Sequence, residues 1–450
     1  MIQTQNPATG VVEQRFSPLS LHQVADALDR ADMAQRIHKT TSLAQRGACL
    51  TQMASLLLAQ KDHYAALMTR EMGKPLSQAV AEVEKCAAAC TYYATHGEAL
   101  LAPRHEANAV IQYDPLGLIL GVMPWNFPFW QVIRCAAPVL MAGNGFVLKH
   151  ASNVPQCALA LQDLFGAAGF VPNLFQTVLV EKDMVAAIIA DDRIRGATLT
   201  GSEAAGASLA RLAGAALKPT VLELGGSDPF IIMPSADLDR AAEAAVQARM
   251  LNTGQSCIAA KRFLIHTDVY DGVVQRILAH VDALTVGDPL DPRHNLGPLA
   301  TQGIRAGLWE DVGSTLAAGA KALRMGGPTD GPGFFYTPTV LADIPPDAPA
   351  ARKELFGPVV SLYRFTTQDD ALRVANSTPY GLGASVWTQE PLEKKAFADG
   401  LEAGSITING MVRSDPALPF GGVKASGYGR ELGSEGIRTF TNMKTLRGLS

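Results

Sequence analysis

From residue 145 to residue 224, short apolar runs alternate with stretches that have helical periodicity. The pattern predicts four strands, at residues 146–148, 175–180, 196–199 and 221–223. Helices are predicted between them, at residues 158–165, 182–190 and 203–213. Strands that alternate with helices indicate a parallel sheet in an α/β fold. Such sheets bind ligands beyond the carboxyl ends of their strands, so functional residues are expected there.

Length and composition limit the class of protein further. The 450 residues suffice for two or three domains, and a second alternating set over residues 236–409 predicts a second α/β domain. Lys and Arg number 38 against 42 Asp and Glu, a net charge of −4, which argues against a nucleic-acid clamp. No apolar run approaches the roughly 18–20 residues of a membrane span. Residues 1–10 lack the pattern of a secretory signal.

The six cysteines form no metal-ligand doublets, so we expect no metal site and a reducing, cytoplasmic setting. The first hundred residues are expected to be helical, with capping boxes at residues 20–23 and 42–45. Residues 109–122 alternate around a Pro-Leu-Gly turn and predict a long hairpin. Residues 440–449 are expected to form a short strand that leaves the body.

Two short segments carry side chains suited to nucleophilic and acid–base chemistry. Cys257 ends the run Asn-Thr-Gly-Gln-Ser-Cys, in which glycine allows close backbone approach and a thiol can be presented at an open turn. A lone cysteine is more often a small buried hydrophobe, and this segment alone slightly favours that interpretation. Glu223 stands at the carboxyl end of a strand before two glycines. A solvated or helix-capping glutamate is at least as good an interpretation of that residue alone.

Two further segments suit oxyanion and phosphate binding. Asn126 lies between Pro124 and Pro128, which fix the backbone so that its amide could donate to a developing oxyanion. The alternative is a rigid structural turn with a buried tryptophan. Residues 200–206 connect a strand to a helix, where backbone N–H groups can cradle a pyrophosphate. The sequence lacks a GxGxxG fingerprint there, and a generic strand–turn–helix has the same pattern.

Taken together, seven motifs resemble the aldehyde dehydrogenase superfamily from near residue 5 to the end. In chain order they are PWNFP, VLK, TGS, ELGG, GQSC, ELFGP and PFGGVKASGYGRE. The most specific pair is Glu223 and Cys257, which are 34 residues apart. Within the superfamily the chain is most similar to the short bacterial succinate-semialdehyde dehydrogenases of the Sad type. The closer match is carried by MPWNFPFWQV, LKHASNVPQCA, ALKPTVLELGGSDPFI and FGGVKASGYGREL.

The resemblance implies an α/β fold of three parts. A Rossmann-type cofactor-binding domain is expected at residues 1–102 and 123–224, and an α/β catalytic domain at residues 225–433. A β oligomerisation element is expected at residues 103–122 and 434–450. The partners implied are a small-molecule aldehyde and a second copy of the chain, in a homodimer or homotetramer, with no nucleic acid and no membrane.

The resemblance also implies a covalent mechanism. Cys257 would be the nucleophile, and a nearby cation or dipole is expected to lower the pKa of its thiol. Asn126 and the backbone N–H of Cys257 would hold the oxyanion of the thiohemiacetal. Hydride transfer to the nicotinamide leaves a thioester, and Glu223 would activate the water that hydrolyses it.

Residue by residue, the resemblance assigns Lys149 to the adenosine ribose and Glu354 to the nicotinamide ribose. The residues expected around the cofactor are Trp125, Lys149, Ser152, Gly201, Ser202, Leu224, Glu354 and Phe356. Strongly NAD-selective members have a glutamate where this chain has Ser152. A neutral serine does not repel a 2′-phosphate, so both NAD and NADP are expected as cofactors.

For the substrate, the resemblance points to Arg134, eight residues after Asn126 on the helix that lines the substrate tunnel. A guanidinium in an apolar tunnel is costly unless it meets an anion, such as the carboxylate of a semialdehyde. The alternative is that Arg134 pairs with an Asp or Glu of the chain. A second arginine of some relatives is replaced by Leu251. Ser414 matches a loop serine that helps to bind the carboxylate, although a plain loop serine is nearly as good an interpretation.

The function implied is NAD(P)-dependent oxidation of succinate semialdehyde to succinate. The alternatives are oxidation of another semialdehyde, such as glutarate semialdehyde, or of a small aldehyde, and a non-enzymatic scaffold. An acylating, CoA-dependent enzyme is disfavoured, because such members lack the deacylating glutamate that is present here as Glu223.

Overall fold

Five parallel strands and one short antiparallel strand form the first sheet. In the computed structural model, which describes residues 2–448, the strand order is β19-β9-β8-β5-β6-β7. The strands are β5 (Leu118–Met123), β6 (Gly145–His150), β7 (Phe175–Thr177), β8 (Ile194–Thr200), β9 (Thr220–Glu223) and β19 (Gly427–Tyr428). Strands β6 to β9 lie where the alternating pattern predicts them.

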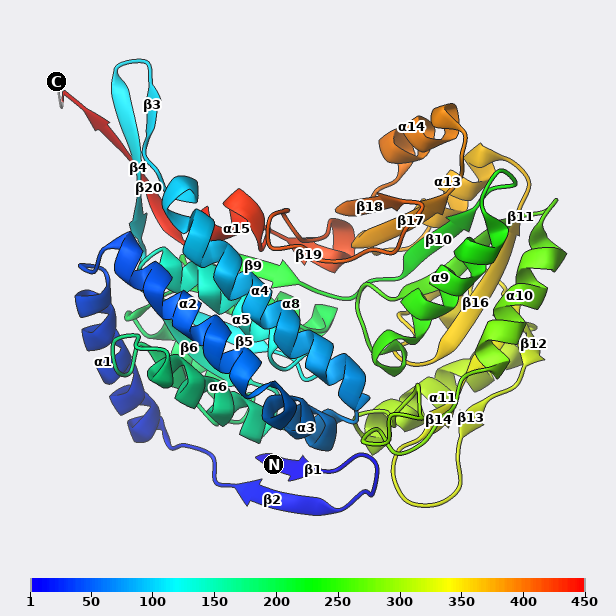
Figure 1. Cartoon of the computed structure of the whole chain (residues 1–450), viewed down its shortest axis with the longest axis horizontal. Coiled ribbons are helices and arrows are strands. Elements are labelled where there is room, and N and C mark those ends of the chain that lie inside the picture. Colours follow the sequence, from blue (N-terminus) through cyan, green and yellow to red (C-terminus); the bar gives the residue numbers. More distant parts are fainter. Residues whose placement is uncertain (1, 449–450) are drawn as a thin grey trace.

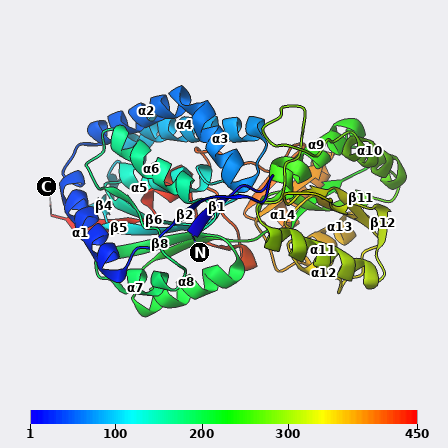
Figure 2. The ribbon, with the colours of Figure 1, turned by 90° about the horizontal axis from the view of Figure 1, so that it is seen from below.

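Helices cover both faces of this sheet (Figure 2). One face carries α2 (Leu43–Ala59), α3 (Lys61–Met72), α4 (Leu76–Leu100), α5 (Trp130–Met141) and α6 (Pro155–Ala167). The other face carries α1 (Leu21–His38), α7 (Met184–Ala190) and α8 (Glu203–Ala215). The two expected capping boxes are confirmed, because Ser20 and Ser42 each accept a hydrogen bond from the backbone of a glutamine that bonds back to them.

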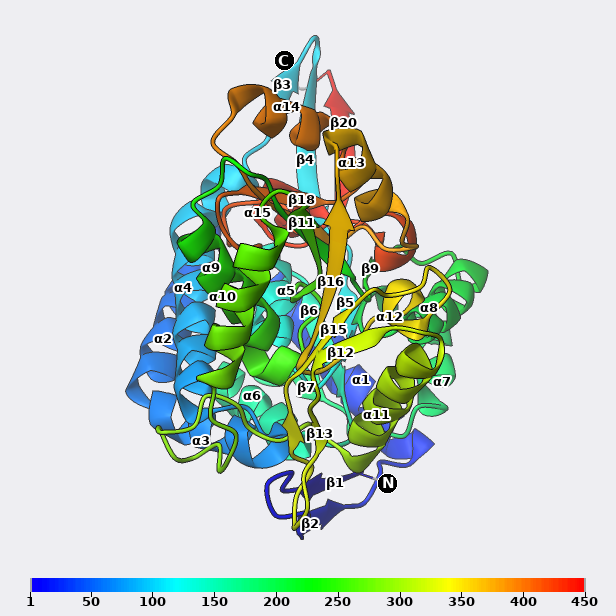
Figure 3. The same cartoon turned by 90° about the vertical axis from the view of Figure 1, so that its right-hand side faces the viewer.

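A second, seven-stranded sheet confirms the expected second α/β unit, with the order β12-β15-β16-β11-β10-β17-β18. Its strands are β10 (Asp228–Ile232), β11 (Ala260–His266), β12 (Lys321–Arg324), β15 (Thr339–Ala342), β16 (Val359–Phe365), β17 (Gly383–Trp387) and β18 (Ser405–Ile408). Figure 3 shows helices on either side of these strands. They are α9 (Leu238–Met250), α10 (Tyr270–Asp282), α11 (Gln302–Ala317), α12 (Pro349–Arg352), α13 (Gln368–Asn376) and α14 (Pro391–Gly400).

The predicted hairpin at residues 109–122 is wrong. Its first half is β4 (Ala109–Pro115), which pairs with β3 (Arg104–Glu106) and with β20 (Thr441–Arg447) in a three-stranded arm. Its second half is β5, which lies inside the first sheet between β6 and β8. Alternation identifies each strand, but it does not specify the partner. The arm projects from the body beside the C-terminus (Figure 1), and the expected C-terminal strand is confirmed as β20.

An N-terminal hairpin precedes the helices and is not expected from the sequence. It consists of β1 (Ile2–Gln5) and β2 (Val12–Phe16), and backbone hydrogen bonds tie it to Ser152 in the first unit and to Phe334 in the second. The remaining short elements are β13 (Gly327–Pro328), β14 (Tyr336–Thr337), α15 (Gly433–Arg438) and the 3-10 turns η1 (Leu251–Gly254) and η2 (Lys424–Ser426). No helix within residues 2–448 combines the length and apolar character needed to cross a membrane.

Candidate active site

The carboxyl ends of four parallel strands meet at one edge of the first sheet. Strands β5, β6, β8 and β9 end at Met123, His150, Thr200 and Glu223, and one of the motifs that the sequence singles out lies at or just beyond each of these ends. The backbone N–H of Gly201 donates to the carbonyl of Glu223 (3.0 Å), which joins two of these ends. The residues therefore gather where an α/β sheet binds ligands.

Cys257 lies in the loop between η1 and β11, and it lines a cavity of about 530 Å³. The cavity walls come from both sheet units, mainly from α4, α5, α9 and the loop at residues 411–414. Burial raises the pKa of the Cys257 thiol to about 12, the Glu354 carboxylate adds to the rise, and Lys261 and Arg134 oppose it. The expectation of a lowered pKa is therefore wrong for this state, because desolvation outweighs the cations. The thiol needs a proton acceptor before it can attack.

The turn that presents Cys257 is held in an unusual backbone conformation. Asn252 and Thr253 both have φ of 55°, a left-handed value that is costly for a β-branched threonine. Asn252 Nδ2 donates to the carbonyls of Asn126 (2.7 Å) and Gln255 (3.1 Å), and these bonds hold the turn. Asn126 Nδ2 also donates to the Gln255 carbonyl (3.1 Å). One of its two amide hydrogens remains for an oxyanion.

Glu223 is buried, and neither of its carboxylate oxygens has a hydrogen-bond partner. Burial raises the pKa of Glu223 well above its usual value, with Arg134 opposing the rise and Glu431 adding to it. A Cβ on Gly421 would fall 2.6 Å from Glu223 Oε1, so only glycine lets that loop pack against the carboxyl group. An unpartnered buried carboxyl with a raised pKa is suited to receiving a proton.

Glu354 is linked to the Cys257 loop by Lys261, a lysine that no motif singles out. Lys261 Nζ pairs with Glu354 Oε1 at 2.9 Å and also donates to the carbonyls of Ser256 and Cys257, both at 2.8 Å. Lys261 thus joins the Cys257 loop to the segment that carries Glu354. A lysine at the start of β11, just before the apolar residues 263–265, is the signal that could have identified it, because a buried charge needs a partner.

The other expected cofactor residues lie around the same sheet edge. Trp125 and Phe356 meet edge to face, with ring centroids 5.7 Å apart. Leu224 is buried against α8, where a Cβ on Gly206 would fall 2.6 Å from its Cδ2. Ser202 caps α8 by accepting from the Ala205 N–H (3.4 Å).

Lys149 and Ser152 lie at and just after the end of β6. Burial lowers the pKa of Lys149, and Glu181 opposes the shift. The carbonyl of Ser152 accepts from the Gln3 N–H of the N-terminal hairpin (3.1 Å). The free N–H groups of the first turn of α8 and the lysine near the end of β6 are donors that fit the phosphates and ribose of a dinucleotide.

Arg134 is buried on α5 and forms an ion pair with Glu431. Its Nη2 donates to Thr200 Oγ1 (3.2 Å), and its guanidinium lies over the Phe420 ring at 4.9 Å. Burial lowers the pKa of Arg134, but the carboxylates of Glu431 and Glu223 outweigh burial and raise it. Arg134 therefore pairs with an acidic residue of the chain, as the alternative interpretation of the sequence predicts. It also lines the cavity.

Ser414 is buried and lines the cavity, where its Oγ accepts from Lys85 Nζ (2.7 Å). No motif singles out Lys85. It lies on α4 with Gln78, Ala81 and Glu82, at the i, i+3, i+4, i+7 spacing of one helix face. This mixed polar stripe beside the apolar positions of α4 is the sequence signal that could have revealed the cavity wall.

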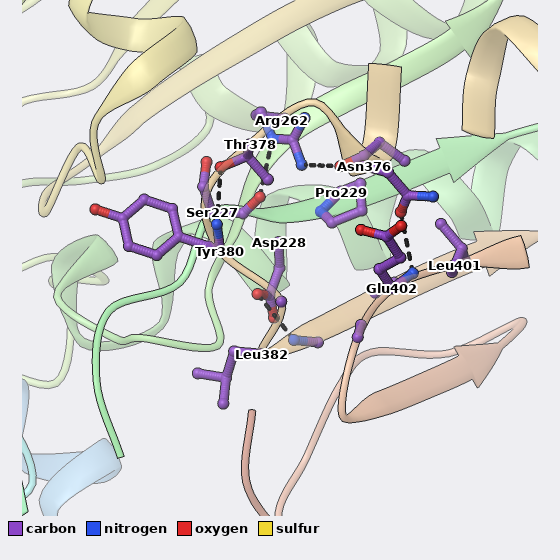
Figure 4. Close-up of a pocket in the computed structure, with 15 residues that line it drawn as sticks. Ser227, Asp228, Pro229, Arg262, Asn376, Thr378, Tyr380, Leu382, Leu401 and Glu402 are labelled. Carbon is purple, nitrogen blue, oxygen red and sulfur yellow. Dashed lines mark hydrogen bonds between the residues drawn. The ribbon is translucent and has the colours of Figure 1, made fainter. Parts of the chain in front are cut away.

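A second cavity lies inside the second α/β unit between β10, β17 and the segment after α13 (Figure 4). Asp228 Oδ1 accepts there from the Gly383 N–H (3.0 Å), and burial raises the pKa of Asp228 to about 6. Its volume of about 10 Å³ suits no more than a water molecule, so it is not a substrate site. Within residues 2–448, no group of three or more His, Cys, Asp or Glu side chains could hold a metal ion.

Comparisons with known proteins all point to one family. The model of the aldehyde dehydrogenase family matches residues 1–446. A protein named succinate-semialdehyde dehydrogenase (NADP+) from Mycolicibacterium paratuberculosis is 52% identical, over 99% of this chain and 96% of its own length. A protein of the same name from Mycobacterium leprae is 51% identical, over 99% of both chains.

Among solved structures, succinic semialdehyde dehydrogenase from Streptococcus pyogenes in complex with NADP+ superposes with a TM-score of 0.97. It is 37% identical, over 99% of both chains. The resemblance carried by the seven motifs and the expected fold class are both confirmed. The chain belongs to the aldehyde dehydrogenase family.

Proposed function

We propose that this protein oxidises succinate semialdehyde to succinate with NAD or NADP. The observation that carries the proposal is the composition of the 530 Å³ cavity. It holds the thiol of Cys257 together with the side chains of Lys85, Arg134 and Ser414, among mostly apolar residues. A carboxylated aldehyde suits such a cavity, because its carboxylate can bind the polar side chains while its carbon chain contacts the apolar residues. The names of relatives that are 51–52% identical over the full length support the same substrate.

The covalent step starts at the Cys257 thiol, which must lose its proton. Glu223 has a raised pKa and contributes to the raised pKa of Cys257, so the two groups share one electrostatic environment. We assign Glu223 as the acceptor of the thiol proton. Sulfur then attacks the aldehyde carbon, and Asn126 Nδ2 with the backbone N–H of Cys257 stabilises the thiohemiacetal oxyanion.

A bound nicotinamide would supply the acceptor for the hydride of the thiohemiacetal carbon. Trp125 and Phe356 are proposed to orient its ring, and Glu354, held by Lys261, its ribose. The resulting thioester is attacked by a water molecule. Glu223, once it has released the thiol proton to solvent, accepts the proton of that water, and the tetrahedral intermediate expels the thiolate of Cys257 and releases succinate.

For the cofactor, we propose that both NAD and NADP bind, with Lys149 at the adenosine ribose and the first turn of α8, with Gly201 and Ser202, at the pyrophosphate. Ser152 carries no charge that would repel a 2′-phosphate. The NADP+ in the names of relatives is consistent with this tolerance.

A homo-oligomer built through the three-stranded arm is also proposed, because β3 and most of β20 are exposed. The domain limits at residues 102, 122, 224 and 433 stay a prediction. The chain passes from one sheet to the other between Glu223 and Asp228, which is consistent with the limit at residue 224. The cytoplasmic setting also stays a prediction.

The test is a panel of aldehydes assayed with both cofactors by the absorbance of the reduced nicotinamide. Succinate semialdehyde should have the highest kcat/KM, above glutarate semialdehyde and well above pentanal, which has similar length without a carboxylate. A preference for glutarate semialdehyde or pentanal would replace the proposed substrate. Cofactor binding without turnover of any aldehyde would favour the scaffold.

A further inference from the structure

The cations near the cavity differ in whether an acidic side chain already neutralises them. Arg134 is paired with Glu431, Lys261 with Glu354, and Lys74, behind the wall, with Glu82. Among residues 2–448, no ion pair includes Lys85. Arg413 also lines the cavity, but it is exposed.

The surroundings of Lys85 prepare it for a ligand. Its ammonium lies over the Trp130 ring, 4.3 Å from the centroid, and donates to Ser414 Oγ at 2.7 Å. An ammonium has three N–H donors, so two remain for another acceptor. Because Ser414 Oγ accepts from Lys85, its own O–H is free to donate. A lysine N–H and a serine O–H therefore converge on the same part of the cavity.

We propose that Lys85 and Ser414 together bind the distal carboxylate of the substrate and so determine the preference for a carboxylated aldehyde. The proposal rests on the proposed function and assigns the carboxylate to a residue that no motif indicates. Arg134 is the weaker candidate, because Glu431 already compensates its charge. A partly buried lysine without an acidic partner gains most from an incoming anion.

The charge of Lys85 is sensitive to pH in the free protein. Burial, together with the charges of Arg134 and Arg413, lowers the pKa of Lys85 to about 8, while Cys86 and Glu82 oppose the shift. Lys85 is therefore charged below pH 8 and loses its charge as the pH rises through that value. At pH values above 8, the KM for succinate semialdehyde should increase, whereas the KM for pentanal should stay unchanged.

The test compares Lys85→Met, which keeps the length of the side chain and removes its charge, with Lys85→Arg, which keeps the charge. Lys85→Met should lower kcat/KM for succinate semialdehyde about tenfold to a hundredfold, mainly through KM, and leave pentanal unchanged or improved. Lys85→Arg should retain most of the preference and lose the rise in KM near pH 8. Lys395→Met, on an exposed face of α14, is the matched control and should change neither aldehyde.

Succinate inhibition of pentanal oxidation provides a reading that does not depend on semialdehyde turnover. Lys85→Met should weaken inhibition by succinate by the same factor, with the melting temperature and pentanal kcat as evidence of a correct fold. A wild-type preference for succinate semialdehyde that persists in Lys85→Met, with unchanged inhibition by succinate, would overturn the assignment of Lys85 and leave the proposed function standing. A wild type that prefers pentanal and is not inhibited by succinate would instead overturn the proposed function.

Discussion

At the scale of single residues, the partner of each buried charge determines what the side chain can do. Glu223 has no hydrogen-bond partner for its carboxyl group, and it is available to exchange protons. Glu431 is ion-paired with Arg134 and accepts a hydrogen bond from Thr198 Oγ1 (3.1 Å). Two buried carboxylates of one region thus differ in role, because only one of them is already neutralised.

The ion pair predicts the phenotype of Arg134→Leu. The substitution leaves Glu431 buried without its cation, which typically costs about 3–5 kcal/mol of folding free energy. We therefore expect a large loss of stability in urea unfolding, and slower oxidation of both succinate semialdehyde and pentanal. The double variant Arg134→Leu/Glu431→Gln should recover part of the stability. A stable Arg134→Leu protein that loses activity only on succinate semialdehyde would instead identify Arg134 as the carboxylate ligand.

Ser152, two residues after the end of β6, gives a prediction for the cofactor preference. Ser152→Glu places a carboxylate where the adenosine ribose is proposed to bind, so it should repel the 2′-phosphate of NADP. The ratio of kcat/KM with NADP to that with NAD should fall at least tenfold, with NAD unaffected or improved. Ser152→Gln, of similar size and neutral, is the control. If the ratio is unchanged in Ser152→Glu, residue 152 does not face the ribose.

At the scale of elements, local patterns predict strands better than they predict partners. The runs that became β6, β8 and β9 are short, apolar and flanked by helices, so their type follows from the sequence alone. The pairing of β4 with β20 depends on residues more than 300 positions away, which no local pattern contains. The N-terminal strands β1 and β2 are short and mainly polar, and they take their form from contacts with both sheet units.

The same distinction applies to the site. Cys257, Asn126 and Glu223 could be singled out because each stands in a short motif after a predicted strand or in a glycine-containing turn. The partner of Arg134 could not, because Glu431 reaches it only through the fold. Lys85 lies within a long helix, and its role becomes visible only when α4, α5 and the loop of Ser414 enclose one cavity.

The arm carries a prediction of its own. Met443, in the middle of β20, is 61% exposed on the arm that is proposed to meet a second copy of the chain, and such an interface would cover its apolar side chain. Met443→Asp should therefore shift the protein toward a smaller species in size-exclusion chromatography with light scattering, while the fold remains intact. The exposed Lys444→Gln on the same strand is the control, although it also gives up a surface ion pair with Asp114. A monomeric wild type, or an unchanged mass for Met443→Asp, would contradict an interface on the arm.

At the scale of the whole molecule, the site exists because two sheet units meet. Asn126 follows β5 and Glu223 ends β9 in the first sheet, whereas Cys257 and Glu354 belong to loops of the second unit. Lys261 and the bonds between Asn126, Asn252 and Gln255 fasten the loops to one another. The proposed nucleophile and the proposed proton acceptor therefore come from different units, and their cooperation depends on both units.

The most direct measurement is a search for the covalent intermediate. Glu223→Gln should slow formation of the thioester, because the amide cannot accept the thiol proton, but it should slow hydrolysis more, because solvent can take the proton of a thiol more readily than the proton of an attacking water. Mixed rapidly with succinate semialdehyde and NADP, this variant should show a burst of reduced cofactor followed by slow turnover. Mass spectrometry of the quenched protein should find one succinyl group on the peptide that contains Cys257, and none in Cys257→Ala. A burst without an acyl group on Cys257, or equal loss of burst and steady state in Glu223→Gln, would contradict the proposed chemistry.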